Sequence, residues 1–158
     1  MIMKIIKGTV TNDCIFQFCL EWIDALARAD YITASSYLRN LDSEWHDAEI
    51  KQAVETYGSM EYLDETIYTV SRFEDAAGDN PRFSRAYTEE LEGFAFIRHP
   101  KWPIEICWNS KVFSSEGVVA TVHMDYALNG EWSDLSSTFD LIRAVDGVTV
   151  ELRRLDVF

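Results

Sequence analysis

The side chains best suited to acid–base chemistry lie close together in the second half of the chain. The stretch ATVHMDYALNGEWSDLSSTFDL contains His123, Asp125, Asp134 and Asp140, with Trp132 among them. A histidine titrates near neutral pH, and a neighbouring carboxylate can fix its tautomer for general acid or base catalysis. The same residues also fit the polar face of a β-hairpin. The elements that carry them must decide between these two interpretations.

Apolar and polar residues alternate from residue 104 onward, which is typical of an antiparallel sheet covered on one face. Turn signals at FSSEG, NGEW and Asp146-Gly147 divide this part into four strands. Asp146-Gly147 predicts a two-residue type I′ turn that pairs Val145 with Val148 and Arg143 with Val150. One apolar face results, made of Ile104, Ile106, Trp108, Val118, Ala120, Val122, Met124, Tyr126, Leu128, Leu135, Phe139 and Leu141.

The alternation slips within the last strand. Val148, Val150 and Leu152 share one parity, whereas Leu155 and Val157 take the other. A β-bulge near Arg153-Arg154 explains the slip, and a bulge there would bend the sheet.

Before residue 59 the apolar residues recur at helical spacing. The first helix, over residues 11–30, has a continuous apolar stripe and can be capped by Thr11, Asn12 or Asp13. The stripe consists of Ile15, Phe18, Cys19, Trp22, Ile23 and Leu26. A short helix follows, with Ala34, Tyr37, Leu38 and Leu41 on one side. A third begins at Ser43, with Gly58 at the position after its C-cap.

Residues 59–99 have the least regular pattern. The segments ETIYTVSRF and GFAFIRHPKWP suit strands, and EDAAGDNPRF suits a loop. A helix over YLDETIYTVSRFEDA is an open alternative.

Helices followed by an antiparallel meander predict an α+β fold. We expect one domain over 1–158, with a helical part over about 11–58 and a meander over about 104–158. The stretch FCLEWIDALARADYITASSYL and this layout resemble the NTF2-like superfamily, which implies helices packed on a curved, cone-shaped sheet. The stretch LNGEWSDLSSTFDL with the closing LRRLDVF resembles a C-terminal pattern of uncharacterised small bacterial domains, which implies no activity.

The alternation of side chains along the strands helps to decide whether His123 and its neighbouring aspartates are catalytic or simply the polar face of a hairpin. His123 and Asp125 lie on the face opposite Val122 and Met124, and Ser136, Thr138 and Asp140 share their face. This polar face looks away from the predicted helices. The NTF2-like resemblance places chemistry inside the cone, where the sequence offers no carboxylate before Asp156. We therefore assign no catalytic residue, and the sequence favours a protein that is not an enzyme.

Charge restricts the class of partner. The 158 residues include 27 acidic and 14 basic side chains, a formal net charge of −13. Such a chain lacks the basic footprint needed for nucleic acid or an anionic membrane, and it suits a basic protein. No signal peptide or sufficiently long apolar segment is present, and Cys14, Cys19 and Cys107 form no recognisable framework. We expect a cytoplasmic protein with reduced thiols.

No cofactor or metal is predicted. His46 and Glu49 have the spacing of two ligands on one helical face, but two ligands do not make a site. His99 precedes Pro100 in a predicted loop and is assigned no role.

Two hypotheses for function follow. The first is a binding protein for a basic partner, such as an immunity protein that neutralises a toxin. Its contacts would be Glu131, Asp134, Asp125, Asp140 and His123 around Trp132, which either folds back onto the core or projects as an anchor. The alternative is an NTF2-type pocket for a small molecule or an isomerase- or dehydratase-like reaction, lined by Trp22, Tyr37, Trp108, Tyr126 and Phe139. Either protein could form a homodimer through the sheet face.

Overall fold

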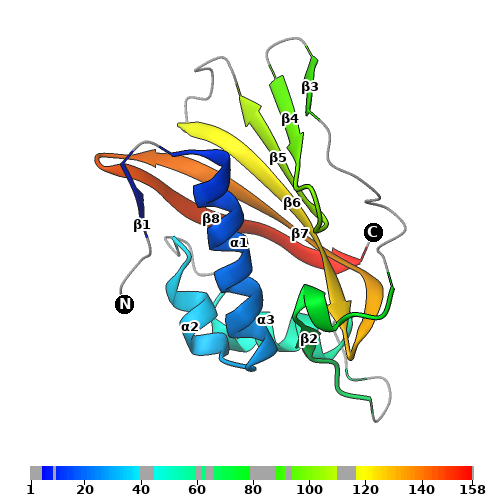
Figure 1. Ribbon diagram of the computed structural model, residues 1–158. Helices are drawn as coiled ribbons and strands as arrows, with labels where there is room; N and C mark the ends of the chain where they lie inside the picture. Colours follow the sequence, from blue (N-terminus) through cyan, green and yellow to red (C-terminus); the bar gives the residue numbers. More distant parts are fainter. Residues whose placement is uncertain are drawn as a thin grey trace.

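Three helices cover one face of a curved antiparallel sheet in the computed structural model (Figure 1), which confirms the α+β class. The structure describes residues 5–8, 10–39, 45–59, 62, 66–78, 88–91, 94–109 and 117–157. Within these residues, no helix is both long and apolar enough to cross a membrane. The NTF2-like resemblance stays a prediction.

Helix α1 (Asn12–Ala27) forms as predicted, with Thr11 as its N-cap. The Thr11 hydroxyl accepts a hydrogen bond from the Cys14 amide (3.2 Å), which satisfies one of the free donors of the first turn. Every residue of the predicted apolar stripe is buried. The sequence therefore placed this helix and its buried face correctly.

Two further helices follow. Asp30 ends the turn after α1 and caps α2 (Tyr31–Ser36) by accepting from the Thr33 amide (3.1 Å). Helix α3 (Asp47–Glu55) ends in a Schellman motif, in which the Gly58 amide donates to Ala53 O (2.7 Å). Gly58 is thus one position later than predicted, because Tyr57 takes the first left-handed position (φ 55°). Leu41, predicted on the apolar side of the second helix, and Ser43, predicted to begin the third, lie outside the described residues.

The sheet has eight strands, and each described pair of strands is antiparallel. They are β1 (Ile5–Lys7), β2 (Val70–Ser71), β3 (Thr88–Leu91), β4 (Phe94–Arg98), β5 (Ile104–Asn109), β6 (Val118–Leu128), β7 (Glu131–Ala144) and β8 (Gly147–Val157). Their order is β1-β8-β7-β6-β5-β4-β3, and β2 pairs with β6 beside a short 3-10 helix, η1 (Phe73–Asp75).

The central part of the β6–β7 hairpin follows the predicted faces, whereas register shifts between Val118 and Ala120 and between Asp125 and Ala127 interrupt the predicted continuous alternation. Val122 pairs with Phe139 on the helix-covered face, and His123 pairs with Thr138 on the other. The two strands are joined by Asn129 (φ 51°) and Gly130 (φ 82°), two successive left-handed residues that produce a type I′ turn.

The β7–β8 hairpin differs from its predicted register. Arg143 pairs with Val148, not Val150, and Ala144 pairs with Gly147. The turn residues are therefore Val145 and Asp146, and neither has a positive φ. The prediction of a type I′ turn at Asp146-Gly147 is wrong, although the faces of both strands are unchanged because the register moved by an even number of residues.

The predicted β-bulge is present. Thr138 pairs with Arg154 while the next residue, Phe139, pairs with Leu152, so Arg153 is the extra residue in β8. Its position explains why both Leu152 and Leu155 are buried despite their opposite parity.

The irregular middle segment contains less regular structure than predicted. Only Val70–Ser71 of ETIYTVSRF forms a strand, and the open alternative of a helix there does not occur among the described residues. The strand predicted in GFAFIRHPKWP is β4. Most of the FSSEG turn and the second half of EDAAGDNPRF lie outside the described residues.

Candidate functional site

The turn between β6 and β7 is fastened to the segment that contains β2 and η1. The Ala77 amide donates to Gly130 O (2.9 Å), and the Gly130 amide donates to the Ser71 hydroxyl (2.7 Å). On the other side of the turn, the Thr69 amide donates to Asn129 Oδ1 (2.9 Å). These hydrogen bonds hold two segments that lie about 60 residues apart in the sequence as one unit.

Trp132 closes this unit by folding back. Its ring stacks on Phe73, with the centroids 5.8 Å apart and the planes inclined by 23°. Its indole N–H donates to Gly78 O (2.9 Å). Phe73 in turn stacks on Trp102 (5.6 Å, 27°), so the three rings form a column. Trp132 is therefore half-buried, and its contacts hold the hairpin against η1. The structure does not show it as a projecting anchor.

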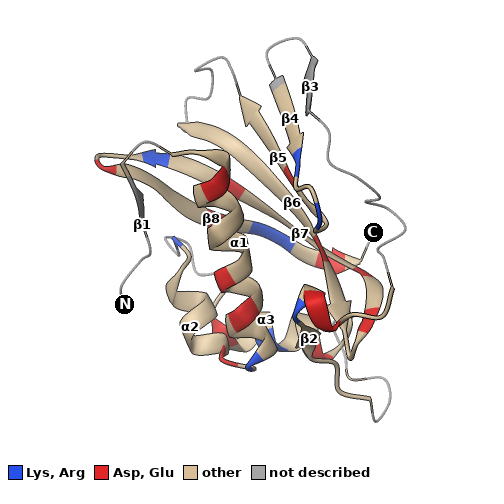
Figure 2. Cartoon of the chain, viewed as in Figure 1, with Lys and Arg blue, Asp and Glu red and all other residues tan. Residues whose placement is uncertain are grey.

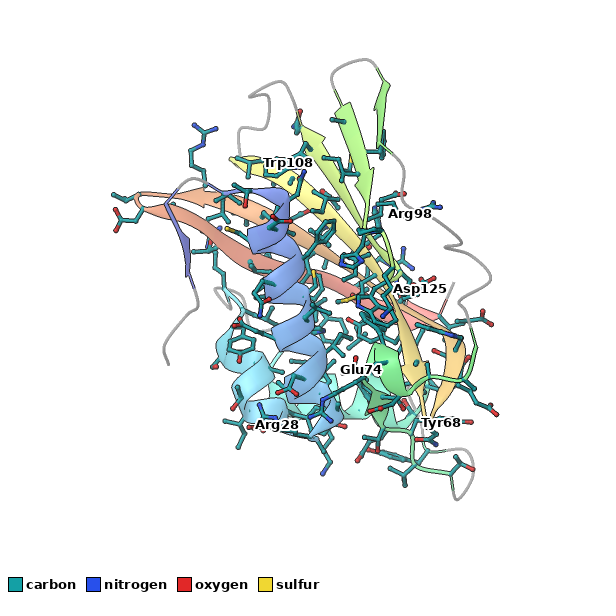
Figure 3. The ribbon with its side chains drawn as sticks, viewed as in Figure 1. Arg28, Tyr68, Glu74, Arg98, Trp108 and Asp125 are labelled. Atoms are coloured by element: carbon teal, nitrogen blue, oxygen red, sulfur yellow. The ribbon has the colours of Figure 1, made fainter. Side chains whose placement is uncertain are left out.

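Four exposed carboxylates lie within two residues of Phe73 or Trp132 in the sequence. Glu74 and Asp75 come from η1, while Glu131 and Asp134 come from the start of β7. We call these four residues the acidic hairpin patch. Figure 2 shows acidic residues on η1 and on the first part of β7, and Figure 3 shows Glu74 at the end of the molecule that also carries Tyr68. The Asp134 amide donates to the Tyr57 hydroxyl (2.8 Å), which ties the patch to the end of α3.

The arginine that precedes η1 is engaged elsewhere. Arg72 donates through Nε and Nη2 to Asp24 Oδ1 on α1 (2.9 and 2.7 Å). This hydrogen bonding with Arg72 holds the pKa of Asp24 below its usual range, although both side chains are largely in contact with solvent. Arg72 is thus bonded to α1. The bond to Asp24 raises the pKa of its guanidinium, and the nearby charges of Asp75 and Glu74 also raise it.

The polar face of the sheet is assembled as predicted but is less exposed than expected. Asp125 pairs with Ser136 and Thr121 pairs with Asp140, so the polar residues are neighbours across the strands. Asp125 and Asp140 are nevertheless only 6% and 5% exposed. The expectation that they contact a partner is therefore corrected, because surrounding groups cover them.

Asp140 has a specific set of partners. Its Oδ1 accepts from the Thr121 hydroxyl (3.1 Å), and its Oδ2 accepts from Arg153 Nη1 (2.9 Å). Asp125 lies beside the loop before β5, where its amide donates to Pro103 O (3.1 Å). Strand alternation gave the correct face for both aspartates, but it carries no information on what covers that face.

His123 does not form the acid–base pair that its sequence neighbours suggested. In the described part of the chain its Nδ1 pairs with the Thr138 hydroxyl (3.2 Å), and no hydrogen bond joins it to Asp125. Partial burial lowers the pKa of His123; Glu105 on the adjacent strand opposes this shift and Arg154 adds to it. The imidazole ring itself remains accessible.

The inward-facing aromatic residues fill the space between helix and sheet. Trp22, Tyr126 and Phe139 are 0% exposed. The Trp22 indole donates to the Tyr126 hydroxyl (2.9 Å), which donates to the Ser137 hydroxyl (2.6 Å). Burial raises the pKa of Tyr126 strongly. These three residues form a packed core, which corrects the expectation that they line a pocket.

The other two predicted pocket residues are partly buried and pack against the edge of the core. Tyr37 is half-buried against Phe18. The Trp108 indole donates to Asn12 Oδ1 at the start of α1 (2.6 Å). Trp108, labelled in Figure 3, also lines a hollow of about 310 Å³ near the β7–β8 turn. The five residues therefore do not surround one common space.

Sequence reasoning missed two features. Glu74 and Asp75 escaped notice because they follow the irregular segment, although the run FEDAAGDN is acidic and ends in turn formers. The second missed feature is the role of His99. Its Nδ1 accepts from the amides of Lys101 and Trp102 (3.0 and 2.9 Å), so it orders the loop that contains Trp102 of the aromatic column. Such a turn is fixed by local geometry that alternation does not reveal.

No group of three or more histidine, cysteine, aspartate or glutamate side chains that could hold a metal occurs in the described ranges. All three cysteines are free thiols. No known family model, curated protein or solved structure matches the chain.

Proposed function

We propose that this chain is a binding protein that presents the acidic hairpin patch to a basic protein partner. The observation that carries the proposal is that Glu74, Asp75, Glu131 and Asp134 are exposed on two segments that backbone hydrogen bonds and the Phe73–Trp132 stack join. Because the turn, η1 and Trp132 are already joined, a partner would not need to order these segments on binding. Pre-ordered charge of this kind lowers the cost of association and steers the encounter.

A basic toxin is the form of partner that we place first, with this chain acting as an immunity protein. The formal charge of −13 favours a strongly basic partner, and long-range attraction is most useful where inhibition must be fast. Compared with the sequence-based hypothesis, the contact set changes. Glu74 and Asp75 join Glu131 and Asp134, whereas buried Asp125 and Asp140 leave it.

The experiment is a capture from a lysate of the native cell at low salt, followed by mass spectrometry. The patch variant is E74Q/D75N/E131Q/D134N, and the matched control is D13N/D47N/D146N/E151Q, which removes the same charge from other exposed positions. The wild type and the control should retain a stoichiometric basic protein that high salt releases, and the patch variant should lose it. Equal retention by the patch variant would refute the proposal.

A further inference from the structure

A groove lies between α3 and the last part of β8. It has a volume of about 440 Å³, within the range of small-molecule sites. Its walls include Trp45, Gln52 and Ala53 on one side and Arg153, Arg154 and Leu155 on the other. It shares no residue with the acidic hairpin patch.

Two successive arginines of β8 line this groove. Arg153, the extra residue of the bulge, and Arg154 are followed there by Leu155 and Asp156. Arg154 already has a carboxylate partner, because its Nε and Nη2 donate to Asp156 Oδ1 (3.2 and 2.7 Å). Arg153 is therefore the arginine of this groove that we consider for ligand binding.

Arg153 is held by an ion pair, and its side chain is otherwise accessible to solvent. Its Nη1 donates to Asp140, a residue that is only 5% exposed, and Thr121 occupies the other oxygen of that carboxylate. Among the described residues, Asp140 is the one partner of the Arg153 guanidinium. A guanidinium has five N–H donors, so most of those on Arg153 are free to bind a ligand. The side chain is 60% exposed, which makes these donors accessible.

The lining defines the chemistry of the ligand. A planar arginine fork matches a carboxylate, and Trp45, Ala53 and Leu155 offer apolar surface for the rest of a small molecule. Glu49 and Asp156 also line the groove, and their charges oppose a second negative group. We propose that the groove binds a small monocarboxylate with an aromatic or other apolar body, held by Arg153.

The test uses 2-naphthoate as the probe and follows amide signals of the isotope-labelled full chain by NMR. Naphthalene-2-methanol lacks the charge, and 2-naphthyl phosphate carries more of it. The main variant is R153Q/D140N, which removes the ion pair as a unit so that no buried carboxylate is left unpaired. R143Q removes an exposed arginine from β7 outside this groove and is the matched control. R153K keeps the charge and loses the fork, and it serves if the double variant does not fold.

We expect 2-naphthoate to shift the amides of Gln52, Gly58 and Leu155, and we expect R153Q/D140N and loss of the ligand's carboxylate each to weaken binding at least about ten-fold. R153K should weaken binding as well, while R143Q should bind as the wild type does. The proposal fails if 2-naphthoate moves no groove amide up to its solubility limit, or if the alcohol binds equally well. It also fails if the Arg153 variants keep wild-type affinity. Tighter binding of the phosphate would overturn the assignment to a monoanion.

Discussion

At the scale of single residues, Tyr126 shows how a polar group is accommodated in the core. Its hydroxyl accepts from Trp22 and donates to Ser137, and all three side chains are at most 1% exposed. Buried polar groups are tolerated when they are hydrogen-bonded, and they are costly when a partner is removed.

The substitution Tyr126→Phe should therefore lower the free energy of unfolding by about 1–3 kcal/mol, because it leaves the Trp22 N–H and the Ser137 hydroxyl without their shared partner. Urea unfolding of Y126F, S137A and the double variant gives the measurement. The double variant should cost less than the sum of the single ones. Additive effects would show that the Tyr126–Ser137 bond contributes little.

The free energy of unfolding should depend on pH through the protonation of His99. Partial burial lowers its pKa from 6.5, Asp13 opposes this shift, and Lys101 adds to it. Protonation at Nδ1 would also break the bonds from the Lys101 and Trp102 amides. Between the lowered pKa of His99 in the folded chain and 6.5 in the unfolded chain, the unfolded chain binds more protons. The stability that neutral His99 contributes is therefore complete above the unfolded pKa, and it is lost as the pH falls through the folded pKa.

NMR titration should place the His99 midpoint below 6.5. His99→Asn keeps an acceptor for the two amides and cannot titrate, so this variant should lose less stability than the wild type on acidification from neutral pH. H123N corrects for the other histidine whose pKa is lowered. A His99 midpoint above 6.5 would contradict the assigned burial and hydrogen bonding.

At the scale of elements, two glycines with the same backbone requirement separate strain from crowding. Gly130 (φ 82°) has nothing within 4 Å of an added Cβ, whereas at Gly58 (φ 76°) such an atom would lie 3.0 Å from Val157 Cγ2 and 3.1 Å from Val157 N. The first position therefore tests the type I′ turn alone. The second also tests the contact between the end of α3 and β8.

Gly130→Ala should lower the free energy of unfolding by about 1–2 kcal/mol, the cost of a left-handed non-glycine residue. Gly58→Ala should cost about 1–3 kcal/mol more because the backbone of β8 must also shift. Thermal and urea unfolding of the two variants decide the matter. Equal losses would mean that α3 and β8 do not meet as closely as described.

Elements were predictable where one periodicity dominates. The stripe of α1 and the faces of β6 and β7 follow from spacing alone, and the bulge at Arg153 follows from the break in spacing. The β7–β8 register failed because Val145-Asp146 competes with Asp146-Gly147 as a turn, and the two choices place the same side chains on the same faces. Alternation cannot distinguish such registers.

The candidate sites were less predictable than the fold. Glu131 and Asp134 were identified, but the segment of Glu74 and Asp75 is joined to theirs by the Phe73–Trp132 stack and by hydrogen bonds of Asn129, Gly130 and Trp132. Asp140 has the expected face, but its hydrogen bonds with Arg153 and Thr121 could not be predicted from alternation. Contacts between distant segments of this kind are set by tertiary packing, which one sequence does not encode as a visible pattern.

At the scale of the whole molecule, a formal charge of −13 means that the folded chain repels itself. Raising NaCl from about 0.01 M to about 0.15 M shortens the screening length from ~30 Å to ~8 Å. The free energy of unfolding should therefore increase over this range, and it should increase less for the patch variant, which carries four fewer negative charges. A decrease for the wild type would show that attractive ion pairs, such as Arg72–Asp24, outweigh the repulsion.

The homodimer through the outer sheet face stays a prediction. That face carries an ion pair between Arg98 and Glu105 (3.4 Å) as well as the exposed His123. Sedimentation of the wild type would measure this association independently of any basic partner.

The most direct test of the proposed function is the association rate constant with the captured basic partner, measured for the wild type and both charge variants across a range of ionic strengths. We predict a rate that falls steeply with salt for the wild type and for the control variant, and a slower, flatter dependence for E74Q/D75N/E131Q/D134N. A rate that does not depend on salt, or one that the patch substitutions leave unchanged, would contradict recognition through the acidic hairpin patch.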